Sequence, residues 1–600
     1  MHPQKKIKIP DKNKKGKPAS AFKTGILYLL PLIIAVGVVP LIVYLKVYEL
    51  QGIKKEVWQS GGKVVDFFSY YKYVVLLFAA AAGLFSLFIN RINNRLPLTK
   101  TYTYMPLAVY ALFAVVSTIA SQYRDVASTG FVERFESVYA LLAYAILAFI
   151  TINLTSTKLH IKYIISALLI SSLIMGLIGL SQYLGMDFFG TAAGKHLILP
   201  PQYQSSAKDL VFKFDKFIIY GTLYNPNYVG SYTVLVLPIC AGIFLFEKKP
   251  VKKVLVGLLG VILLLCLIGS GSLAGLTGTV LAAVLLAVFL RRHIIKHIKV
   301  VAIICLSSLI LLTGINYLTG GGISKGFAIF DNGAQAPHTV YIKDIILKDN
   351  TIGFVTDEQS VFLKLDNDDL YFYDDKNNAL AVKQEQDTNV FEDQKYSMFR
   401  FKKASSQLLN CFIADKSFYI LTSPTGFKIA AATPKLLDTV IHPEKFGFEH
   451  REAAFTARGF IWSRSIPLLK ETIFVGHGPD TFPLYFPQED IVGKLNAYGT
   501  VNMFVDKPHN LYLQMAINTG IPSLLAFVAL FLIYAVTSFK LYFKKNITGY
   551  KDYIGISVFS AISGYCVTSL ANDSVVSVAP VFWVLLGLGV ACNFLTKKEL

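Results

Sequence analysis

The sequence has few charged residues and no cysteine pattern of the kind that holds small secreted domains together. Only 16% of its 600 residues are charged, whereas soluble proteins carry about a quarter. Of its six cysteines, only Cys411 lies outside the apolar runs, so it has no partner in its polar surroundings. The sequence therefore predicts neither a disulfide framework nor a zinc site.

Loops that bind phosphate or calcium are also missing. The acidic clusters at 366–369 and 374–378 lack the central glycine and the spaced final glutamate of a calcium hand. Clusters of Asp and Asn between short apolar runs are more typical of solvated turns. No glycine-rich nucleotide loop and no metal-ligand spacing is present. We expect no metal and no cofactor.

Long apolar runs dominate the sequence, in which 54% of the residues are hydrophobic. A helix needs about 20 apolar residues to cross a bilayer, and about twelve runs approach that length. They lie near 25–46, 72–90, 102–120, 137–154, 163–183, 228–246, 253–270, 273–290, 299–318, 520–539, 553–570 and 578–596. The first run is longer than a signal-peptide core and lacks a small-residue cleavage site, so we expect it to be retained. The sequence predicts an all-α, multi-pass membrane protein.

The net charge of +20 is distributed unevenly. Lys and Arg crowd the tail at 1–24 and the short loops between apolar runs, whereas acidic residues outnumber basic ones in the long segment 319–508. This asymmetry is that of the positive-inside rule and does not favour a nucleic-acid partner. We expect both termini in the cytoplasm, a protein of the cytoplasmic membrane, and 319–508 on the extracytoplasmic side.

The segment 319–508 divides into two parts. From 338 to 432, short apolar runs alternate with Asp/Asn turns, which predicts an inserted β-rich module. Tyr371 and Tyr373 within it suit sugar stacking, although alternating aromatic residues are also typical of a strand core. From 451 to 508 the pattern becomes helical, and an interfacial helix follows before the last three spans in 509–600. Runs seven and eight touch at residues 269–272, where we expect a tight turn; one long, broken helix is the alternative.

Three motifs stand out at the ends of these spans. The first is His509-Asn510-Leu511-Tyr512-Leu513-Gln514, followed by Gly520-Ile521. The second is Arg458-Gly459-Phe460-Ile461-Trp462 with Gly476-His477-Gly478-Pro479-Asp480 downstream, and the third is Asn225-Pro226-Asn227 at the start of a span. In this order, and with one large loop before the third-last span, the chain resembles the O-antigen ligase and O-antigen polymerase superfamily of bacterial envelope glycosyltransferases. Apart from the β-rich insertion, the resemblance covers essentially the whole chain.

The resemblance implies transfer of a glycan from an undecaprenyl-diphosphate carrier to an acceptor hydroxyl on a glycan, lipid or protein, with inversion and without a metal. His509 would be the general base, because an imidazole exchanges protons near neutral pH. The alternative for His509 is an interfacial histidine that only caps a helix. Asn510, Tyr512 and Gln514 would contact the glycan or support the base, although Tyr512 also suits the aromatic belt of a membrane protein.

Arginine suits the diphosphate, because its planar fork binds phosphate oxygens in pairs and keeps its charge. By the resemblance, Arg458 would fill this role, with Arg134 and Arg464 as further candidates; the alternatives are a solvated helix face for Arg458 and pairing of Arg134 with Glu133 or Glu136. Asn225 and Asn227 would bind phosphate or sugar, yet Asn-Pro-Asn is also an ordinary helix start. His477 would contact sugar or shape its glycine-rich loop.

The chain departs from the family at one position. Where many relatives read Ser-x-Ser-Arg-Gly, it has Ser270-Gly271-Ser272-Leu273-Ala274. The resemblance therefore leaves one phosphate contact missing at Leu273. We hypothesise that Lys507, beside the histidine, supplies the missing charge.

Other functions remain open at this stage. A protein O-oligosaccharyltransferase would use the same donor and differ only in its acceptor. A transporter or flippase would be expected to show interrupted helices and charges near the middle of the membrane. The candidate residues instead gather at one outer surface, which favours an enzyme over a transporter. An inactive envelope scaffold is the third alternative, which Leu273 and the insertion leave open.

Overall fold

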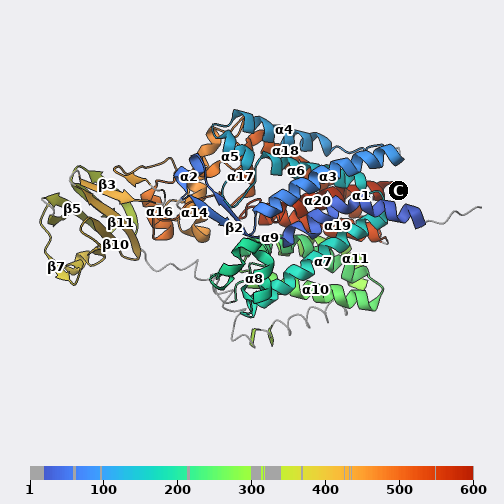
Figure 1. Ribbon diagram of the computed structural model, residues 1–600, viewed down its shortest axis with the longest axis horizontal. Helices are drawn as coiled ribbons and strands as arrows, with labels where there is room; N and C mark the ends of the chain where they lie inside the picture. Colours follow the sequence, from blue (N-terminus) through green and yellow to red (C-terminus); the bar gives the residue numbers. More distant parts are fainter. Residues whose placement is uncertain are drawn as a thin grey trace, which may run out of the picture.

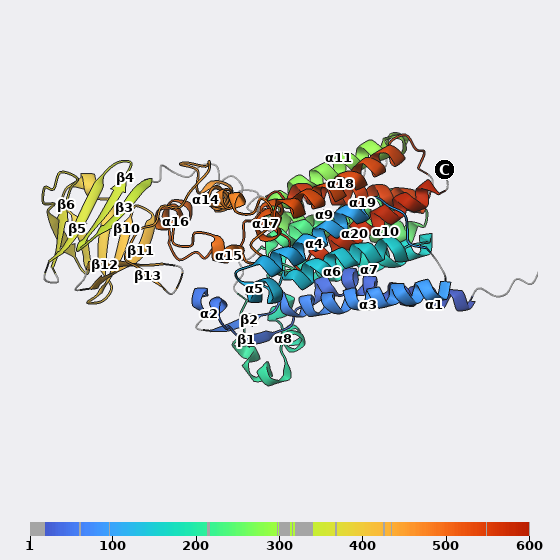
Figure 2. The same ribbon diagram turned by 90° about the horizontal axis from the view of Figure 1, so that it is seen from above.

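The computed structural model describes residues 19–58, 62–94, 97–212, 217–296, 298, 313–314, 316–317, 340–366, 369–423, 426–431, 433, 435–547 and 549–598. The span expected at 299–318, most of the basic tail and the start of the expected outer segment lie outside these residues, apart from single positions. Within the described part, a helix bundle, a polar helical layer and a β-module follow one another along the longest axis of the molecule (Figures 1 and 2).

Apolar sequence accounts for the helix bundle. Seven helices are long and apolar enough to cross a membrane: α3 (Tyr70–Asn94), α7 (Lys158–Tyr183), α9 (Pro226–Phe246), α10 (Pro250–Gly269), α11 (Leu273–Lys296), α18 (Ile521–Tyr542) and α20 (Ala579–Lys597). Four more lie in expected spans: α1 (Ala19–Gly37), α4 (Tyr104–Ala120), α6 (Val138–Leu154) and α19 (Tyr550–Thr568). The mostly helical, multi-pass character is confirmed, whereas the count of twelve spans stays a prediction.

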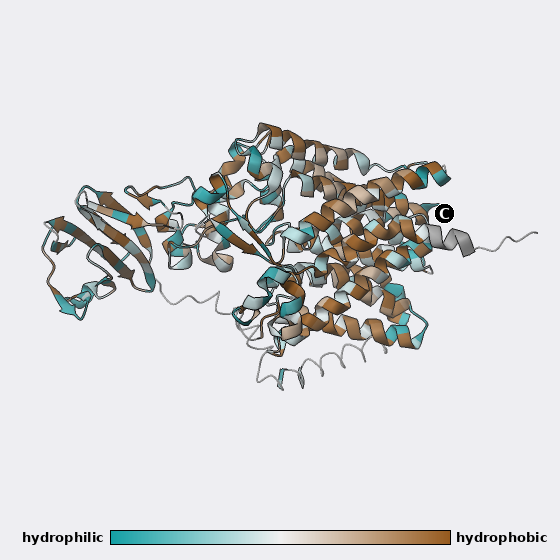
Figure 3. Ribbon diagram, viewed as in Figure 1, coloured by the Kyte–Doolittle hydropathy of each residue, from teal (hydrophilic) through white to brown (hydrophobic). Residues whose placement is uncertain are grey.

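The centre of the bundle is formed by helices that are apolar all round. α9, α19 and α20 are buried along most of their lengths, while α10, α11 and α18 keep exposed apolar faces suited to lipid. Figure 3 shows that the bundle helices are mainly hydrophobic in sequence. Between α10 and α11 the chain turns tightly at residues 270–272, with Gly271 at φ +60°, so the two are separate helices. A Cβ on Gly275 would lie 2.7 Å from the Cα of Gly230, so α9 and α11 meet at a contact that only small residues allow.

Basic residues gather at one end of the bundle. Arg291 donates to the carbonyl of Phe543 (3.2 Å), Arg292 donates to Asn546 (2.6 Å), and Lys545 pairs with Asp552 (3.0 Å). The opposite end carries short elements: β1 (Lys46–Glu49), α2 (Ile53–Val57), β2 (Lys63–Asp66), α5 (Arg124–Thr129) and α8 (Ala192–Ile198), with 3-10 turns at Val39–Leu41, Phe188–Gly190 and Pro201–Lys208. The two ends of the bundle thus differ, and which end faces the cytoplasm stays a prediction from the positive-inside pattern.

The β-module is a sandwich of two antiparallel sheets. One sheet has the order β3-β4-β5-β6 and the other β13-β12-β11-β10-β9-β8-β7. The strands are β3 (Ile342–Lys348), β4 (Thr351–Thr356), β5 (Ser360–Asp366), β6 (Asp369–Tyr373), β7 (Val382–Glu385), β8 (Thr388–Phe391), β9 (Phe399–Lys403), β10 (Leu408–Ile413), β11 (Lys416–Ser423), β12 (Gly426–Ala430) and β13 (Leu436–Leu437). Phe354 of one sheet packs on Phe401 and Phe418 of the other, with ring centroids 5.8 Å apart in both pairs.

The sandwich also decides the orientation of the two tyrosines. Phe372 is buried in the core, so Tyr371 and Tyr373 point to the opposite face of their sheet, and Tyr371 is 47% exposed. The module rests on α16 (Ile491–Tyr498), where Asn496 accepts from the backbone of Ile342 (3.0 Å) and donates back to its carbonyl (2.8 Å). α14 (Ala454–Ser465), Pro467–Lys470, α15 (Phe482–Tyr485) and α17 (Leu511–Thr519) complete the layer between module and bundle (Figure 2).

Candidate functional site

His509 lies where the polar layer meets the bundle, at the end opposite to the basic residues. Asn510 is the N-cap of α17, because its side chain accepts from the backbone N–H groups of Tyr512 (2.9 Å) and Leu513 (3.0 Å). His509 precedes this cap with φ +48°, a left-handed conformation that is uncommon outside glycine and often found at functional sites. Its side chain is 29% exposed.

The imidazole faces a buried carboxylate. Nδ1 of His509 lies 3.0 Å from Oδ2 of Asp573, which sits in the loop between α19 and α20 and is 1% exposed. In the described part of the chain, neither carboxylate oxygen of Asp573 accepts a hydrogen bond, so His509 is the group that lies closest to its charge at ion-pair distance. Burial raises its pKa, but His509 and Lys507 outweigh burial and hold the pKa below its usual value. Asp573 is therefore an ionised partner for His509.

This pairing defines what the ring can do chemically. A carboxylate opposite Nδ1 favours the tautomer with its proton on that nitrogen, which leaves Nε2 as the basic atom. The carboxylate also stabilises the imidazolium that forms when Nε2 accepts a proton. His509 and Asp573 together have the geometry of a general base with an orienting acid.

α14 ties together the two loops that carry this pair. The indole N–H of Trp462 donates to the carbonyl of Pro508 (2.9 Å), next to His509. Arg458, one helical turn earlier, donates through Nε to the carbonyl of Ala571 (3.1 Å), two residues before Asp573. The Arg-Gly-Phe-Ile-Trp motif therefore connects the loop that carries His509 to the loop that carries Asp573.

Arg458 also has unused hydrogen-bonding capacity. Its Nη1 donates to the carbonyl of Phe455 (3.0 Å), and within the described residues no carboxylate lies at ion-pair distance from its guanidinium. Burial lowers its pKa, and the charge of Asp573 partly offsets that effect. Arg458 is thus a half-buried cation without a paired acid among the described residues.

The other cations near His509 are already paired with acids. Arg134 is 8% exposed, contacts Asp480 at 2.7 Å and Asp506 at 3.5 Å, and so joins neither Glu133 nor Glu136. Lys507 lies 3.5 Å from Asp506 and donates to the hydroxyl of Tyr228 at the start of α9. Burial lowers the pKa of Lys507, but the charges of Asp506, Tyr228 and Asp573 raise it further, so the ammonium stays charged.

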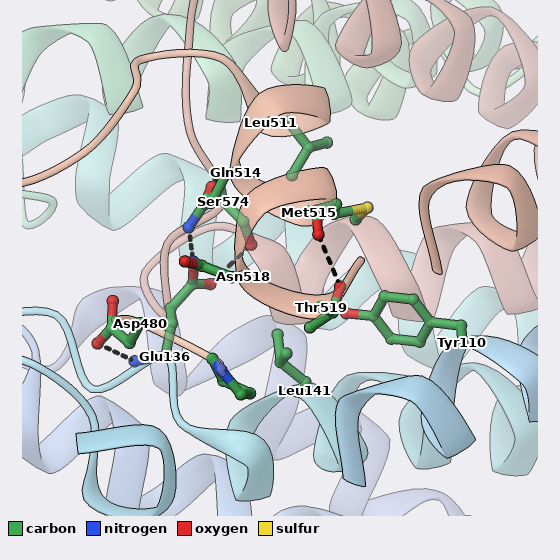
Figure 4. A pocket seen from close by; sticks show the side chains of 11 residues that line it. Tyr110, Glu136, Leu141, Asp480, Leu511, Gln514, Met515, Asn518, Thr519 and Ser574 are labelled. Carbon is green, nitrogen blue, oxygen red and sulfur yellow. Dashed lines mark hydrogen bonds between the residues drawn. The ribbon is translucent and has the colours of Figure 1, made fainter. Parts of the chain in front are cut away.

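Glu136 clamps the loop of Asp573 from the other side (Figure 4). Its carboxylate accepts from Ser574 Oγ (2.6 Å), Tyr144 Oη (2.9 Å) and Gln514 Nε2 (2.7 Å). Gln514 in turn accepts from the backbone N–H of Ser574 (2.9 Å). Burial raises the pKa of Glu136 to about 7. The four groups fix the residue that follows Asp573 against α17.

The remaining candidates divide by their contacts. Arg464 is 6% exposed and lies 2.8 Å from Asp490, so its guanidinium forms a buried ion pair within the polar layer. His477 stacks on Tyr485 with centroids 3.6 Å apart and lies 3.4 Å from Glu471. Burial lowers the pKa of His477.

The asparagines and Tyr512 act mainly on the backbone. Asn225 is the N-cap of α9 and accepts from the N–H of Asn227 (2.8 Å), while the carbonyl of Asn227 accepts from Asn572 (3.2 Å). Tyr512 donates to the carbonyl of Cys566 (2.7 Å). These contacts hold the starts of α9 and α17 beside the end of α19.

Sequence reasoning missed the acidic half of the site. Asp573 and Asp506 were assigned no role, Glu136 was considered only as an ion-pair partner of Arg134, and Asp480 appeared only as part of a motif. The signal for Asp573 was Asn572-Asp573-Ser574, a polar triplet between the last two spans. Polar residues in a short loop on the side of the histidine are candidates to face it.

Comparison with known proteins supports the resemblance drawn from the motifs. Residues 258–528 match the O-antigen ligase family. The match begins within α10 and ends within α18, so it includes Leu273, Arg458, Lys507 and His509 but not Asp573. No curated protein and no solved structure matches the chain significantly.

Proposed function

We propose that this chain, which belongs to the O-antigen ligase superfamily, transfers a glycan from an undecaprenyl-diphosphate carrier to an acceptor hydroxyl. The proposed site lies at the outer face of the cytoplasmic membrane. The observation that carries the proposal is the 3.0 Å contact between His509 and buried Asp573, with Arg458 bound to the same loop. A base and a cation that both contact the loop of Asp573 are what a displacement at an anomeric carbon needs.

The proposed step is a single displacement with inversion. Nε2 of His509 takes the proton of the acceptor hydroxyl while the acceptor oxygen forms a bond to the anomeric carbon. The bond between that carbon and the diphosphate oxygen breaks, and its electron pair leaves with the diphosphate. Asp573 holds the ring and balances the imidazolium, and Arg458 offers N–H groups to the leaving oxygen.

The reaction class is tested with a deletion strain. Such a strain should accumulate a lipid-diphosphate-linked glycan, and the wild-type chain should convert it to acceptor-linked glycan and free carrier diphosphate. Mass spectrometry of the lipid fraction and gel analysis of the surface glycan measure both. Movement of intact lipid-linked glycan across the membrane, without loss of the glycan from its carrier, would instead identify a transporter.

Arg458 should matter through its charge at the leaving group. We expect Arg458→Ala to lower kcat by about 10²–10³-fold, since removing one preformed donor to a developing anion costs about that much. Arg458→Lys should recover part of the rate, because it keeps the charge but not the fork. The measurement is single-turnover transfer from purified donor in nanodiscs. Arg451→Ala, at an exposed arginine of the same segment, is the control and should retain full activity.

Lys507 should compensate for Leu273. Lys507 contacts Tyr228 in the first turn of α9, and Gly230 in the same turn packs against Ser272 beside Leu273. We expect Lys507→Ala to lower kcat by at least about tenfold, one lost charge contact in a partly buried site. Adding Leu273→Arg should restore most of that loss. If the double variant is no better than Lys507→Ala, the two positions do not share a role.

A further inference from the structure

The outer face of the seven-stranded sheet differs in character from the rest of the β-module. Phe399 and Phe401 point into the core, so Arg400 and Lys402 between and after them point outward. By the same alternation, Phe412 of β10, Tyr419 of β11 and Lys428 of β12 lie on that outer side. We call these five residues the basic face.

Cross-strand register places four residues of the basic face in two neighbouring rows, and Lys428 in a third row opposite Leu421. In one row, Arg400 is opposite Phe412, and its guanidinium carbon lies 5.5 Å from the centre of that ring. In the next row, Lys402 is opposite Asn410, and Asn410 is opposite Tyr419. Directly opposite side chains are about 5 Å apart. A chain lying across the strands would meet, in turn, a cation, an amide and a ring.

The cations of the basic face have no acidic partner in the described part of the chain. Within the described residues, no ion pair involves Arg400, Lys402 or Lys428, and Glu385, which continues the row of Lys402 on β7, pairs with Lys383 at 2.7 Å. Arg400 and Lys402 are exposed, and Tyr419 is 39% exposed. The charge is therefore available to a ligand rather than used within the fold.

The four-stranded sheet offers a contrast within the same module. On its outer side, Lys348 and Lys364 share their hairpin end with Asp366 and Asp369, which are paired in register. That side carries no surplus of positive charge. The basic face is thus a property of one sheet and not of the whole module.

The position of the module narrows the choice of ligand. It projects from α16, beyond the polar layer and away from the helix bundle (Figure 2). A bilayer would surround the helix bundle, and the polar layer would separate the bilayer surface from the module, so lipid headgroups are not the expected ligand. Aromatic rings stack on the C–H faces of sugars, and Arg and Lys pair with carboxylate or phosphate.

We propose that the basic face binds an anionic glycan, with carboxylate or phosphate groups along its chain. This inference rests on the proposed function and deepens it, since it assigns the substrate class: the acceptor or growing polymer is acidic. Binding to the module would keep the chain near the site between successive transfers.

Binding is tested with the full-length protein in uncharged phosphatidylcholine nanodiscs. The probes are fluorescent oligogalacturonate for carboxylate, poly(glycerol phosphate) for phosphate, and dextran as the neutral polymer. Fluorescence anisotropy should show binding of one or both anionic probes, weakened by salt, and none of dextran. Equal binding of dextran, or no binding of either anionic probe, would overturn the proposal, and so would binding only to vesicles that contain anionic lipid.

Matched charge reversals locate the surface. The triple variant Arg400→Glu, Lys402→Glu and Lys428→Glu should bind at least about tenfold more weakly, the combined effect of several exposed charge contacts. The control Lys348→Glu, Lys364→Glu and Lys376→Glu makes the same change of charge elsewhere in the module and should bind like wild type. Equal losses in both variants would contradict the assignment.

Two further variants distinguish a failure of the binding proposal from misfolding of the triple variant and from a failure of the proposed function. Tyr419→Ala removes a stacking ring without changing charge and should weaken binding about tenfold, the scale of one aromatic contact, even if the triple variant does not fold. His509→Ala should bind the anionic probe normally while losing transfer. Intact binding together with intact transfer in His509→Ala would refute the assignment of the base. Intact binding by a wild-type protein that transfers no glycan would refute the proposed function, and neither result would refute the basic face.

Discussion

His509→Ala is expected to abolish glycan transfer while leaving the protein inserted and the donor bound. Loss of a general base costs about 10²–10⁴-fold in rate, and here no other described group stands 3.0 Å from Asp573 to replace it. The measurement is surface glycan and lipid-linked precursor in a deletion strain complemented with each variant at equal protein level. The variant strain should accumulate the precursor.

The control for this prediction is a histidine of the same chain. His442, exposed on the side of the β-module and 3.3 Å from Asp344, lies outside the site, so His442→Ala should complement fully. If His509→Ala also complements fully, the base assignment is wrong, and a transporter or a scaffold becomes the better explanation.

Asp573→Asn separates orientation from basicity. The amide is nearly the same size, but it can present its N–H group to Nδ1 of His509, which favours the wrong tautomer, and it has no charge to balance an imidazolium. We expect kcat to fall by about 100-fold, within the range for a misoriented base, with little change in KM. A change confined to KM would place Asp573 in substrate binding instead.

Glu136→Gln is expected to lower both stability and activity, although Glu136 does not touch His509. The carboxylate now accepts three hydrogen bonds, one of them from the amide of Gln514. In the Gln variant, the N–H group of the new side chain would face the N–H group of Gln514, and neither could accept a hydrogen bond from the other. An unsatisfied buried donor costs about 1–3 kcal/mol, and the loop of Asp573 should shift. We expect both thermal stability and kcat to fall, the latter about tenfold or more.

Exchanging the two side chains provides the decisive control. In Glu136→Gln with Gln514→Glu, the new amide donates to the new carboxylate, whose second oxygen accepts the N–H of Ser574. The oxygen of the new amide accepts from Ser574 Oγ and Tyr144 Oη, as Glu136 does now. The double variant should recover stability and most of kcat, whereas Gln514→Glu alone should be the worst of the three, with two carboxylates facing each other. If the exchange rescues stability but not kcat, the clamp stabilises the fold without positioning Asp573.

The sequence by itself determined the parts of this protein that depend on local pattern. Apolar runs place the helices because a bilayer demands unbroken hydrogen-bonded apolar segments. Asp/Asn turns between short apolar runs indicate the β-rich region, and residues 269–272 indicate a turn. The motifs around His509 and Arg458 identify the family, and Asn510 and Asn225 cap helices as their residue types predict.

Only the tertiary structure decided which groups meet. The alternation Tyr371-Phe372-Tyr373 is the same whichever face is buried, and packing against Phe391 and Phe401 is what turns Phe372 inward. Arg134 meets Asp480 and Asp506 rather than its sequence neighbours, because the loop before α6 packs on the polar layer. His509 meets Asp573 because α17 and the end of α19 are held together, a contact between separate elements that no local pattern encodes. Chemistry at this site depends on charge pairs across loops, and those pairs exist only once the helices that carry the loops have packed.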